Sequence, residues 1–287
     1  MVDKDRELKE EAKRQIEATR QRVMLANRIN ERMGAIKHKI IIASGKGGVG
    51  KSSFAVNLAK VLVAHKKKVG FLDGDIHGPS AGKFFGIKDI QISGQAESIN
   101  PQVTEDGIRV MSMAFLLTEA DSAVIWRGPL KMHMIDSLLG DVNWGELDYL
   151  VIDTPPGTGD EILSLAQRIS NLDGIVMITT PQSAAVASAV KTISFAKSMK
   201  TPVIGVVENM GPFKCPDCGR EIRLFGSGGG EQAAKSYGVP FLGSIPFDEL
   251  MEGDSEAGLA VVVEHAHAPS AVQINRIAEK IMEQVER

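Results

Sequence analysis

The sequence predicts an α/β fold built on a doubly wound, mostly parallel sheet. Two observations carry this prediction. Several apolar runs of strand length lack polar alternation, which is typical of strands buried on both faces. Stretches with apolar residues at helical spacing separate these runs, so helical crossovers join consecutive parallel strands. The chain has 287 residues, of which 43% are hydrophobic, and this is ample for a sizeable core.

The elements follow in the order that such a sheet requires. The first strand is centred on Ile40–Ile42, whose β-branched side chains favour extended backbone, and a glycine-rich turn leads into a helix that includes Phe54. The strand at 148–153 ends in an acid, and the C-terminal helix has an apolar stripe opposite mixed charges. Further strands are expected at 68–72, 108–113, 148–153, 174–179, 202–207 and 241–245, and further helices at 128–139, from 160, at 183–199 and at 271–285.

Residues 1–37 alternate acidic and basic side chains around a thin apolar stripe that includes Leu8, Ile16 and Val23. Two interpretations stay open: a solvated helix or partly disordered extension, and a helix that docks on a partner or on a second copy of the chain. Gly34 is expected to end this segment before the first strand. We therefore divide the chain into an N-terminal extension over 1–37 and one domain over 38–287.

Composition excludes several classes of function. The net charge is −3 and aromatic residues make up 5% of the chain, so we expect no nucleic-acid partner. No apolar run reaches the about 18 residues of a membrane-spanning helix, and we expect no membrane partner. Cys215 and Cys218 are the only cysteines, too few for a disulfide scaffold and typical of a reducing compartment. These features predict a cytoplasmic protein.

The turn after the first strand matches the phosphate-binding pattern G-x-x-x-x-G-K-[ST]. Glycines allow a polyphosphate to approach backbone N–H groups and permit positive φ angles. Lys51 would contact the β- and γ-phosphates, the Ser52 hydroxyl would bind Mg²⁺, and the helix N-terminus adds partial positive charge. The nucleotide-binding residues predicted here are Gly45, Lys46, Gly47, Gly48, Val49, Gly50, Lys51, Ser52 and Ser53.

The same residues also satisfy G-x-G-x-x-G, and Asp73 lies downstream where a dinucleotide-binding fold places its ribose-binding acid. The pair Lys51-Ser52 favours the phosphate loop, because a dinucleotide fold has no use for a lysine and a magnesium-binding hydroxyl at that point. A purely structural glycine turn is the third interpretation.

Acidic residues follow two of the predicted strands, at the sheet edge where ligands of such folds bind. Asp73 and Asp75 follow the strand at 68–72, and either could instead cap the next helix, although Ser80 already offers a cap. Asp153 ends the strand at 148–153, as the magnesium-side carboxylate of a phosphate-loop NTPase does. We expect Asp153 to bind a metal-ligated water and the Gly157 N–H to face the γ-phosphate.

A hairpin at 211–225 carries the C-x-x-C pair Cys215 and Cys218. Two thiolates do not complete a four-coordinate soft-metal site, so the missing ligands must come from another molecule. A symmetric dimer would supply four thiolates, suitable for a [4Fe–4S] cluster or a zinc ion. A redox dithiol and a knuckle without metal are the other interpretations of this spacing.

Six motifs in this order resemble the Mrp/ApbC family of iron–sulfur cluster carrier ATPases, over about residues 38–250. That family belongs to the deviant-Walker-A P-loop NTPases, with MinD, ParA and the nitrogenase iron protein. The resemblance implies a P-loop fold of the MinD/ParA type with ATP and Mg²⁺ as cofactors. The motifs are the phosphate loop at 45–52, DGDIHGPS at 73–80, WRGP at 126–129, DTPPGTGD at 153–160, ENM at 208–210 and CPDCG at 215–219.

By position in these motifs, the resemblance implies roles for single residues. Lys46 would reach the phosphates of a partner subunit and, with Lys51, stabilise the transition state, so that a slow ATP hydrolysis would depend on dimerisation. Asp75 would orient the attacking water and contribute to the Mg²⁺ site, and Asn209 would contact adenine. Cys215 and Cys218 would hold the bridging cluster. His77 stands where we would expect tyrosine.

The combined hypothesis is a homodimeric ATPase that carries a [4Fe–4S] cluster and passes it to apo iron–sulfur proteins. Three alternatives remain at this point. They are a spatial-organisation switch of the MinD or ParA kind, an electron donor like the nitrogenase iron protein, and a zinc-stapled dimeric scaffold.

Overall fold

The computed structural model describes residues 2–75, 78, 80–87, 90, 93–95, 98–116, 128–157 and 160–287. An eight-stranded sheet crosses the molecule in the order β12-β9-β8-β1-β7-β2-β6-β5. Every neighbouring pair is parallel except β5 with β6. The main strands are β1 (Ile36–Ser44), β2 (Val69–Asp73), β5 (Gln102–Val103), β6 (Arg109–Ser112), β7 (Leu147–Asp153), β8 (Gly174–Thr179), β9 (Val203–Gly211) and β12 (Phe241–Pro246).

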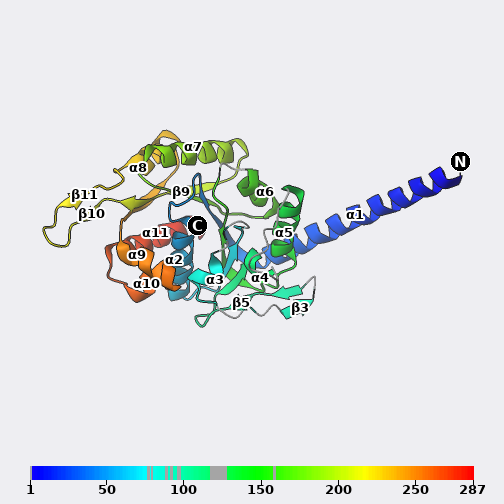
Figure 1. Cartoon of the computed structure of the whole chain (residues 1–287), viewed down its shortest axis with the longest axis horizontal. Coiled ribbons are helices and arrows are strands. Elements are labelled where there is room, and N and C mark those ends of the chain that lie inside the picture. Colours follow the sequence, from blue (N-terminus) through cyan, green and yellow to red (C-terminus); the bar gives the residue numbers. More distant parts are fainter. Residues whose placement is uncertain are drawn as a thin grey trace.

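Helices cover both faces of the sheet (Figure 1), which confirms the predicted doubly wound α/β class. One face carries α2 and α11, which pack on each other, and the other carries α6, α7 and α8. The helices are α1 (Val2–Gly34), α2 (Lys51–Ala64), α3 (Ala81–Phe84), α4 (Met113–Leu116), α5 (Gly128–Gly140), α6 (Asp160–Arg168), α7 (Ser183–Ser198), α8 (Gly229–Ser236), α9 (Glu249–Ala257), α10 (Val261–Glu264) and α11 (Pro269–Val285). No helix among the described residues is both long and apolar enough to cross a membrane.

The core lies where the two helical layers meet the central strands. Ile40, Ile41 and Ile42 of β1 are fully buried, because β1 has neighbours on both sides and helices on both faces. Two small hairpins lie outside the main sheet, β3 (Ser93–Gln95) with β4 (Ser98–Asn100) and β10 (Phe213–Lys214) with β11 (Glu221–Ile222). Strand β9 is longer than the expected 202–207 and runs on to Gly211, directly into the second hairpin.

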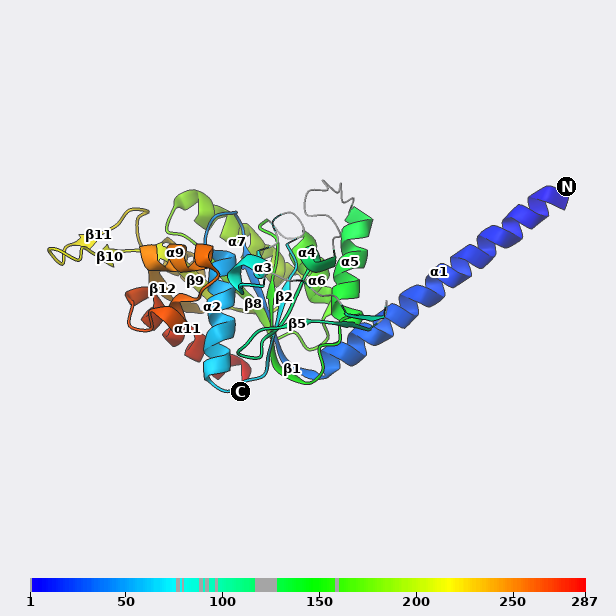
Figure 2. The same cartoon turned by 60° about the horizontal axis from the view of Figure 1, so that its bottom comes forward.

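The N-terminal extension is a single helix, α1, that ends at Gly34 as predicted. Its first part projects from the body (Figure 2), where Ile16 and Val23 are 69% and 55% exposed. Its last turns pack on α5 and bury Ile29 and Met33. The helix is thus solvated over one part and docked on its own domain over the other.

Candidate functional site

The turn between β1 and α2 has the conformation that a phosphate-binding loop requires. Gly48 and Gly50 have φ angles of 76° and 80°, in the left-handed region that favours glycine. A Cβ on Gly50 would lie 2.1 Å from the Nδ2 atom of Asn209, and a Cβ on Gly45 would lie 2.4 Å from the backbone of α7. The loop is therefore packed closely between α7 and the end of β9.

Lys51 and Asp153 meet beneath this loop, because α2 begins and β7 ends at the same edge of the sheet. The Lys51 ammonium forms an ion pair with Asp153 Oδ1 and donates a hydrogen bond to Ser52 Oγ at 3.1 Å. The Lys51 side chain is 6% exposed and that of Asp153 is 1% exposed. Burial raises the pKa of Asp153 above its ordinary value, and the Lys51 charge opposes this rise. Each buried charge thus compensates the other.

The oxygen atoms around Asp153 suit a Mg²⁺ ion. Asp153 Oδ2 is buried and has no hydrogen-bond partner within the part of the chain that the structure describes. The Ser52 hydroxyl lowers the pKa of the same carboxylate, and the Asp75 charge raises it. Mg²⁺ prefers hard oxygen ligands and usually takes one or two carboxylates together with phosphate oxygens. Ser52, Asp75 and Asp153 are therefore gathered as a magnesium site would need them.

Asp73 organises the loop that carries Asp75. Its carboxylate is fully buried and accepts hydrogen bonds from the N–H groups of Asp75, Ser80 and Ala81, at 2.8 to 3.1 Å, and from the Ser112 hydroxyl. Burial, together with the Asp153 charge, raises the pKa of Asp73 to about 6. The capping alternative is confirmed for Asp73, whereas Ser80 makes no side-chain cap.

The structure also places two more of the predicted nucleotide contacts, Lys46 and Gly157. Lys46 is exposed at the tip of the phosphate loop and has no hydrogen bond or ion pair to any described residue. The Gly157 N–H, expected to face the γ-phosphate, instead donates to the Ser44 carbonyl at 3.0 Å. The loop after β7 therefore folds back on the end of β1, and the contact of Gly157 with a γ-phosphate stays a prediction.

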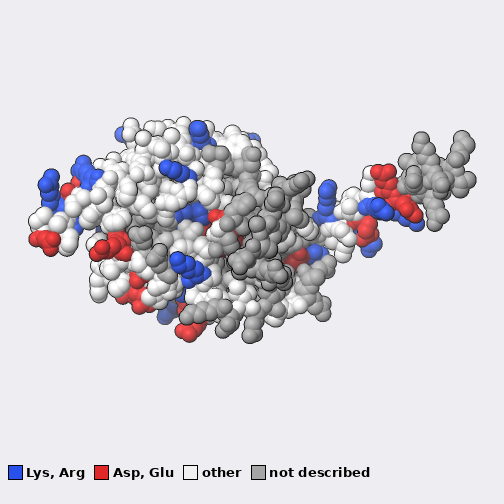
Figure 3. Space-filling view, in the orientation of Figure 1, with Lys and Arg blue, Asp and Glu red and all other residues white. Residues whose placement is uncertain are grey.

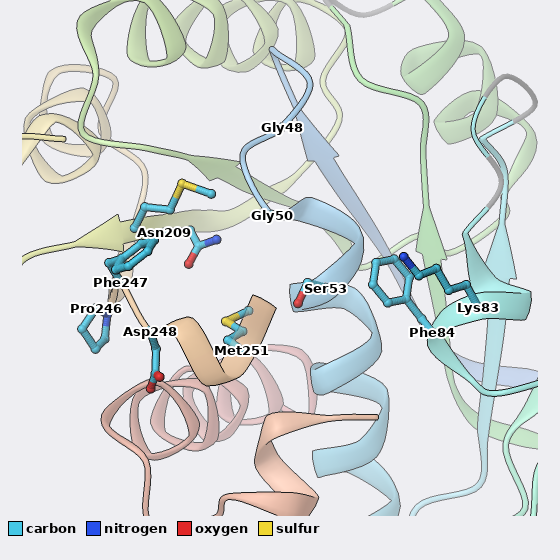
Figure 4. A pocket seen from close by; sticks show the side chains of 11 residues that line it. Gly48, Gly50, Ser53, Lys83, Phe84, Asn209, Pro246, Phe247, Asp248 and Met251 are labelled. Carbon is cyan, nitrogen blue, oxygen red and sulfur yellow. The ribbon is translucent and has the colours of Figure 1, made fainter. Parts of the chain in front are cut away.

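A pocket of about 360 Å³ opens beside the phosphate loop (Figure 4). Asn209 lines it and donates from Nδ2 to the Val49 carbonyl at 3.0 Å, so this predicted adenine contact does lie next to the loop. The segment after β12 supplies wall residues that the sequence analysis did not single out. The lining residues are Gly48, Gly50, Ser53, Lys83, Phe84, Asn209, Met210, Pro246, Phe247, Asp248 and Met251.

Glu208, next to Asn209, fixes the neighbouring helix. Its carboxylate is buried and accepts hydrogen bonds from the N–H groups of Gly228 and Gly230 at the start of α8, and from the Ser244 hydroxyl. A carboxylate at a helix N-terminus is stabilised by the helix dipole as well as by these bonds. The sequence offered no spacing that would pair these residues.

The cysteines lie in the turn of the β10–β11 hairpin, which projects from the body on the side opposite α1 (Figures 1 and 2). Both thiols are free, and Cys218 is exposed. The N–H groups of Cys218 and Asp217 point at the Cys215 thiol and lower its pKa, which favours the thiolate that binds metal. Among the described residues no group of three or more His, Cys, Asp or Glu side chains could hold a metal ion. Two thiolates alone do not complete a four-coordinate soft-metal site.

His77 of the motif at 73–80 and the pair Trp126-Arg127 of the motif at 126–129 lie outside the described residues. On the face drawn in Figure 3, the described basic and acidic side chains are interspersed over the body.

A profile of the ParA family, described as the NUBPL iron-transfer P-loop NTPase, matches residues 35–282. The chain belongs to this family. It is 48% identical over 259 residues to the iron-sulfur cluster carrier protein of Methanocaldococcus jannaschii, a match that covers 90% of this chain and 89% of the relative. The protein of the same name from Saccharolobus solfataricus is 42% identical over 259 residues, or 90% of this chain and 88% of the relative.

Solved structures agree with the fold. A nucleotide-binding protein from Archaeoglobus fulgidus, in complex with ADP, has a TM-score of 0.72 and 40% identity over 85% of this chain and 94% of its own. The cell division ATPase MinD of Pyrococcus furiosus has a TM-score of 0.63 at 22% identity, over 86% of this chain and 99% of its own. These comparisons confirm the P-loop fold of the MinD/ParA type and the resemblance to iron–sulfur carriers drawn from the motifs.

Proposed function

We propose that this NTPase binds and hydrolyses ATP with Mg²⁺ in the cytoplasm. Two copies would hold one [4Fe–4S] cluster between their hairpins and pass it to apo iron–sulfur proteins. The observation that carries this proposal is that one chain joins a phosphate-binding site to a projecting pair of free cysteines, Cys215 and Cys218. Relatives named iron-sulfur cluster carrier proteins support the choice of cargo.

A cluster held by four cysteines requires a second copy of the chain. A [4Fe–4S] cluster takes four cysteine thiolates, and each chain has two cysteines. A two-fold axis between hairpins would bring the same two residues together twice. Because the hairpin projects from the body and Cys218 is exposed, its turn is open to contact from a second copy.

The phosphate site assigns a task to each charged residue. Lys51 would leave Asp153 and bind the β- and γ-phosphates, and Asp153 Oδ2 and the Ser52 hydroxyl would then hold Mg²⁺. The metal would neutralise charge on the phosphate oxygens. Asp75 would orient the attacking water. Lys46, exposed and without a described partner, is free to reach the phosphates of the second copy and stabilise charge in the transition state.

Anaerobic reconstitution with iron and sulfide tests the cargo. We expect about four iron atoms per two wild-type chains, an absorption band near that of a [4Fe–4S] protein, and a dimer in sedimentation. Cys215→Ala should lose the iron, whereas Leu224→Ala, a change at an exposed position after β11, should keep it. Transfer is measured by activation of an apo-enzyme that needs a [4Fe–4S] cluster.

Two outcomes would overturn this proposal. Iron that stays bound in Cys215→Ala would place the cluster elsewhere. Zinc and no iron in anaerobically purified wild type would support the zinc-stapled scaffold instead, since two thiolate pairs also complete a tetrahedral zinc site.

A further inference from the structure

Strand β9 carries both a wall of the pocket beside the phosphate loop, here called the base pocket after the predicted adenine contact Asn209, and the first residues of the cysteine hairpin. Asn209 lines the pocket and bonds to the phosphate loop, and Met210, which also lines it, has a φ of 59°. This φ is uncommon for a residue with a long side chain and marks a bend that the surroundings impose. Gly211 ends the strand, and Phe213 begins β10. The backbone therefore leads directly from the base pocket into the hairpin.

Phe247 makes a second connection between the same two places. It lines the base pocket and also a groove of about 580 Å³ beneath the hairpin, and the two cavities share the segment Pro246 to Asp248. Figure 4 shows Phe247 beside Asn209 on the wall of the base pocket. Its N–H donates to the Gly211 carbonyl at 3.0 Å, which ties it to the end of β9.

The ring of Phe247 contacts both ends of the hairpin segment. Its centroid lies 5.7 Å from that of Phe213, at the start of the hairpin, and 6.1 Å from that of Phe225, just after it. These separations are typical of packed aromatic pairs. Closely packed groups shift together, because interiors rearrange between discrete packings and do not deform continuously. A displacement of Phe247 would therefore move both ends of the hairpin.

We propose that Phe247 is a positioning residue that transmits occupancy of the base pocket to the cysteine hairpin. A base that enters the pocket would press on Phe247, whose ring also packs against Phe213 and Phe225. The bound nucleotide thereby changes the direction in which Cys215 and Cys218 are presented. This inference rests on the proposed function, which identifies the pocket as a nucleotide site and the hairpin as a cargo site. It adds the physical link between the two sites.

Thiol alkylation in the metal-free, full-length chain tests the link. The reduced protein is treated with iodoacetamide, and the alkylation rates of Cys215 and Cys218 are followed by peptide mass spectrometry without nucleotide, with saturating Mg-ADP and with saturating Mg-ATPγS. We expect nucleotide to change the wild-type rates by about fivefold, at the lower end of typical coupling between sites.

Phe213→Ala is the informative variant, because Phe213 contacts Phe247 but does not line the base pocket. It should bind Mg-ADP with the wild-type Kd and lose the nucleotide effect on alkylation. Leu224→Ala, the matched control, lies next to Phe225 but is 60% exposed and should keep the effect. Phe247→Leu retains an apolar side chain without the ring, should fold, and should reduce the effect.

Two results would overturn the inference: wild-type alkylation rates that do not respond to either nucleotide, or a full response in Phe213→Ala. Both measurements are made without iron. A chain that shows the link but binds no cluster would therefore contradict only the proposed function, and one that binds a cluster but shows no link would contradict only this inference.

Discussion

Replacing Lys51 by methionine should destabilise the nucleotide-free protein and make its stability depend on pH. The substitution keeps most of the apolar stem but leaves the Asp153 carboxylate, 1% exposed, without its counter-charge. Breaking a buried ion pair by removing one partner costs about 3–5 kcal/mol. For a chain of this size that lowers Tm by roughly 6–20 °C.

The sign of the pH dependence follows from Asp153. Burial already raises its pKa in the folded wild type, and loss of Lys51 raises it further. An acid whose pKa is higher in the folded than in the unfolded state penalises folding above the folded pKa, and the penalty disappears as pH falls towards the unfolded pKa. The Tm difference between Lys51→Met and wild type should therefore be largest near pH 8 and shrink towards pH 5.

Thermal unfolding in EDTA without nucleotide, at several pH values, provides the assay. Asp153→Asn alone should also destabilise, because it leaves the Lys51 ammonium buried without a partner. The double variant Lys51→Met with Asp153→Asn removes both charges and should recover much of the loss. A Tm loss in Lys51→Met that is below about 2 °C, or that is equal at pH 8 and pH 5, would refute the reasoning.

Three further predictions concern single buried features. Glu208→Ala should lower the free energy of unfolding by about 3 kcal/mol, because two N–H groups at the start of α8 lose a charged acceptor. The control Glu231→Ala, on the exposed surface of α8, should leave the stability unchanged. Equal Tm values for the two variants would contradict this prediction. Asp73, with a pKa of about 6 against 3.8 for an ordinary Asp, costs the folded state about 3 kcal/mol above pH 6, a cost that vanishes below about pH 4. In Asp73→Asn, Tm should therefore rise less than in wild type as the pH is lowered from 7 to 5. An unchanged dependence of Tm on pH would argue against a raised pKa of Asp73. Gly45→Ala should lower Tm because its Cβ meets α7 backbone, whereas Gly47→Ala, whose nearest contact is 3.8 Å away, should unfold like wild type.

The phosphate loop and the acid at the end of β7 could be predicted because their chemistry is local. A loop that wraps a polyphosphate needs glycine at fixed positions, and a magnesium-side carboxylate must sit where a buried strand ends. Both requirements act over a few consecutive residues, so their spacing is visible in the sequence. The apolar runs that formed the sheet are predictable for the same reason.

The pocket beside the phosphate loop could not be predicted beyond Asn209. Pro246, Phe247 and Met251 reach it from the end of β12 and the segment that follows, which lie beside β9 only because β12 pairs with β9 in the sheet. The cap supplied by Asp73 likewise depends on a loop that folds back, and the N–H of Gly157 points to Ser44 because of how two strand ends meet. These contacts join residues that are distant in sequence, so the local spacing of apolar and polar residues does not predict them.

Helix α1 is exposed to solvent over its first turns and packs on the folded body over its last turns. The two parts of the helix should therefore differ in their susceptibility to proteolysis. Trypsin can reach Arg20 or Arg22 on the exposed turns, whereas α5 covers the later turns. A chain trimmed to residue 23 would keep Ile29, Met33 and the Arg28–Asp141 ion pair. A chain trimmed to residue 38 would lose that apolar contact and expose the side of α5 that it covers.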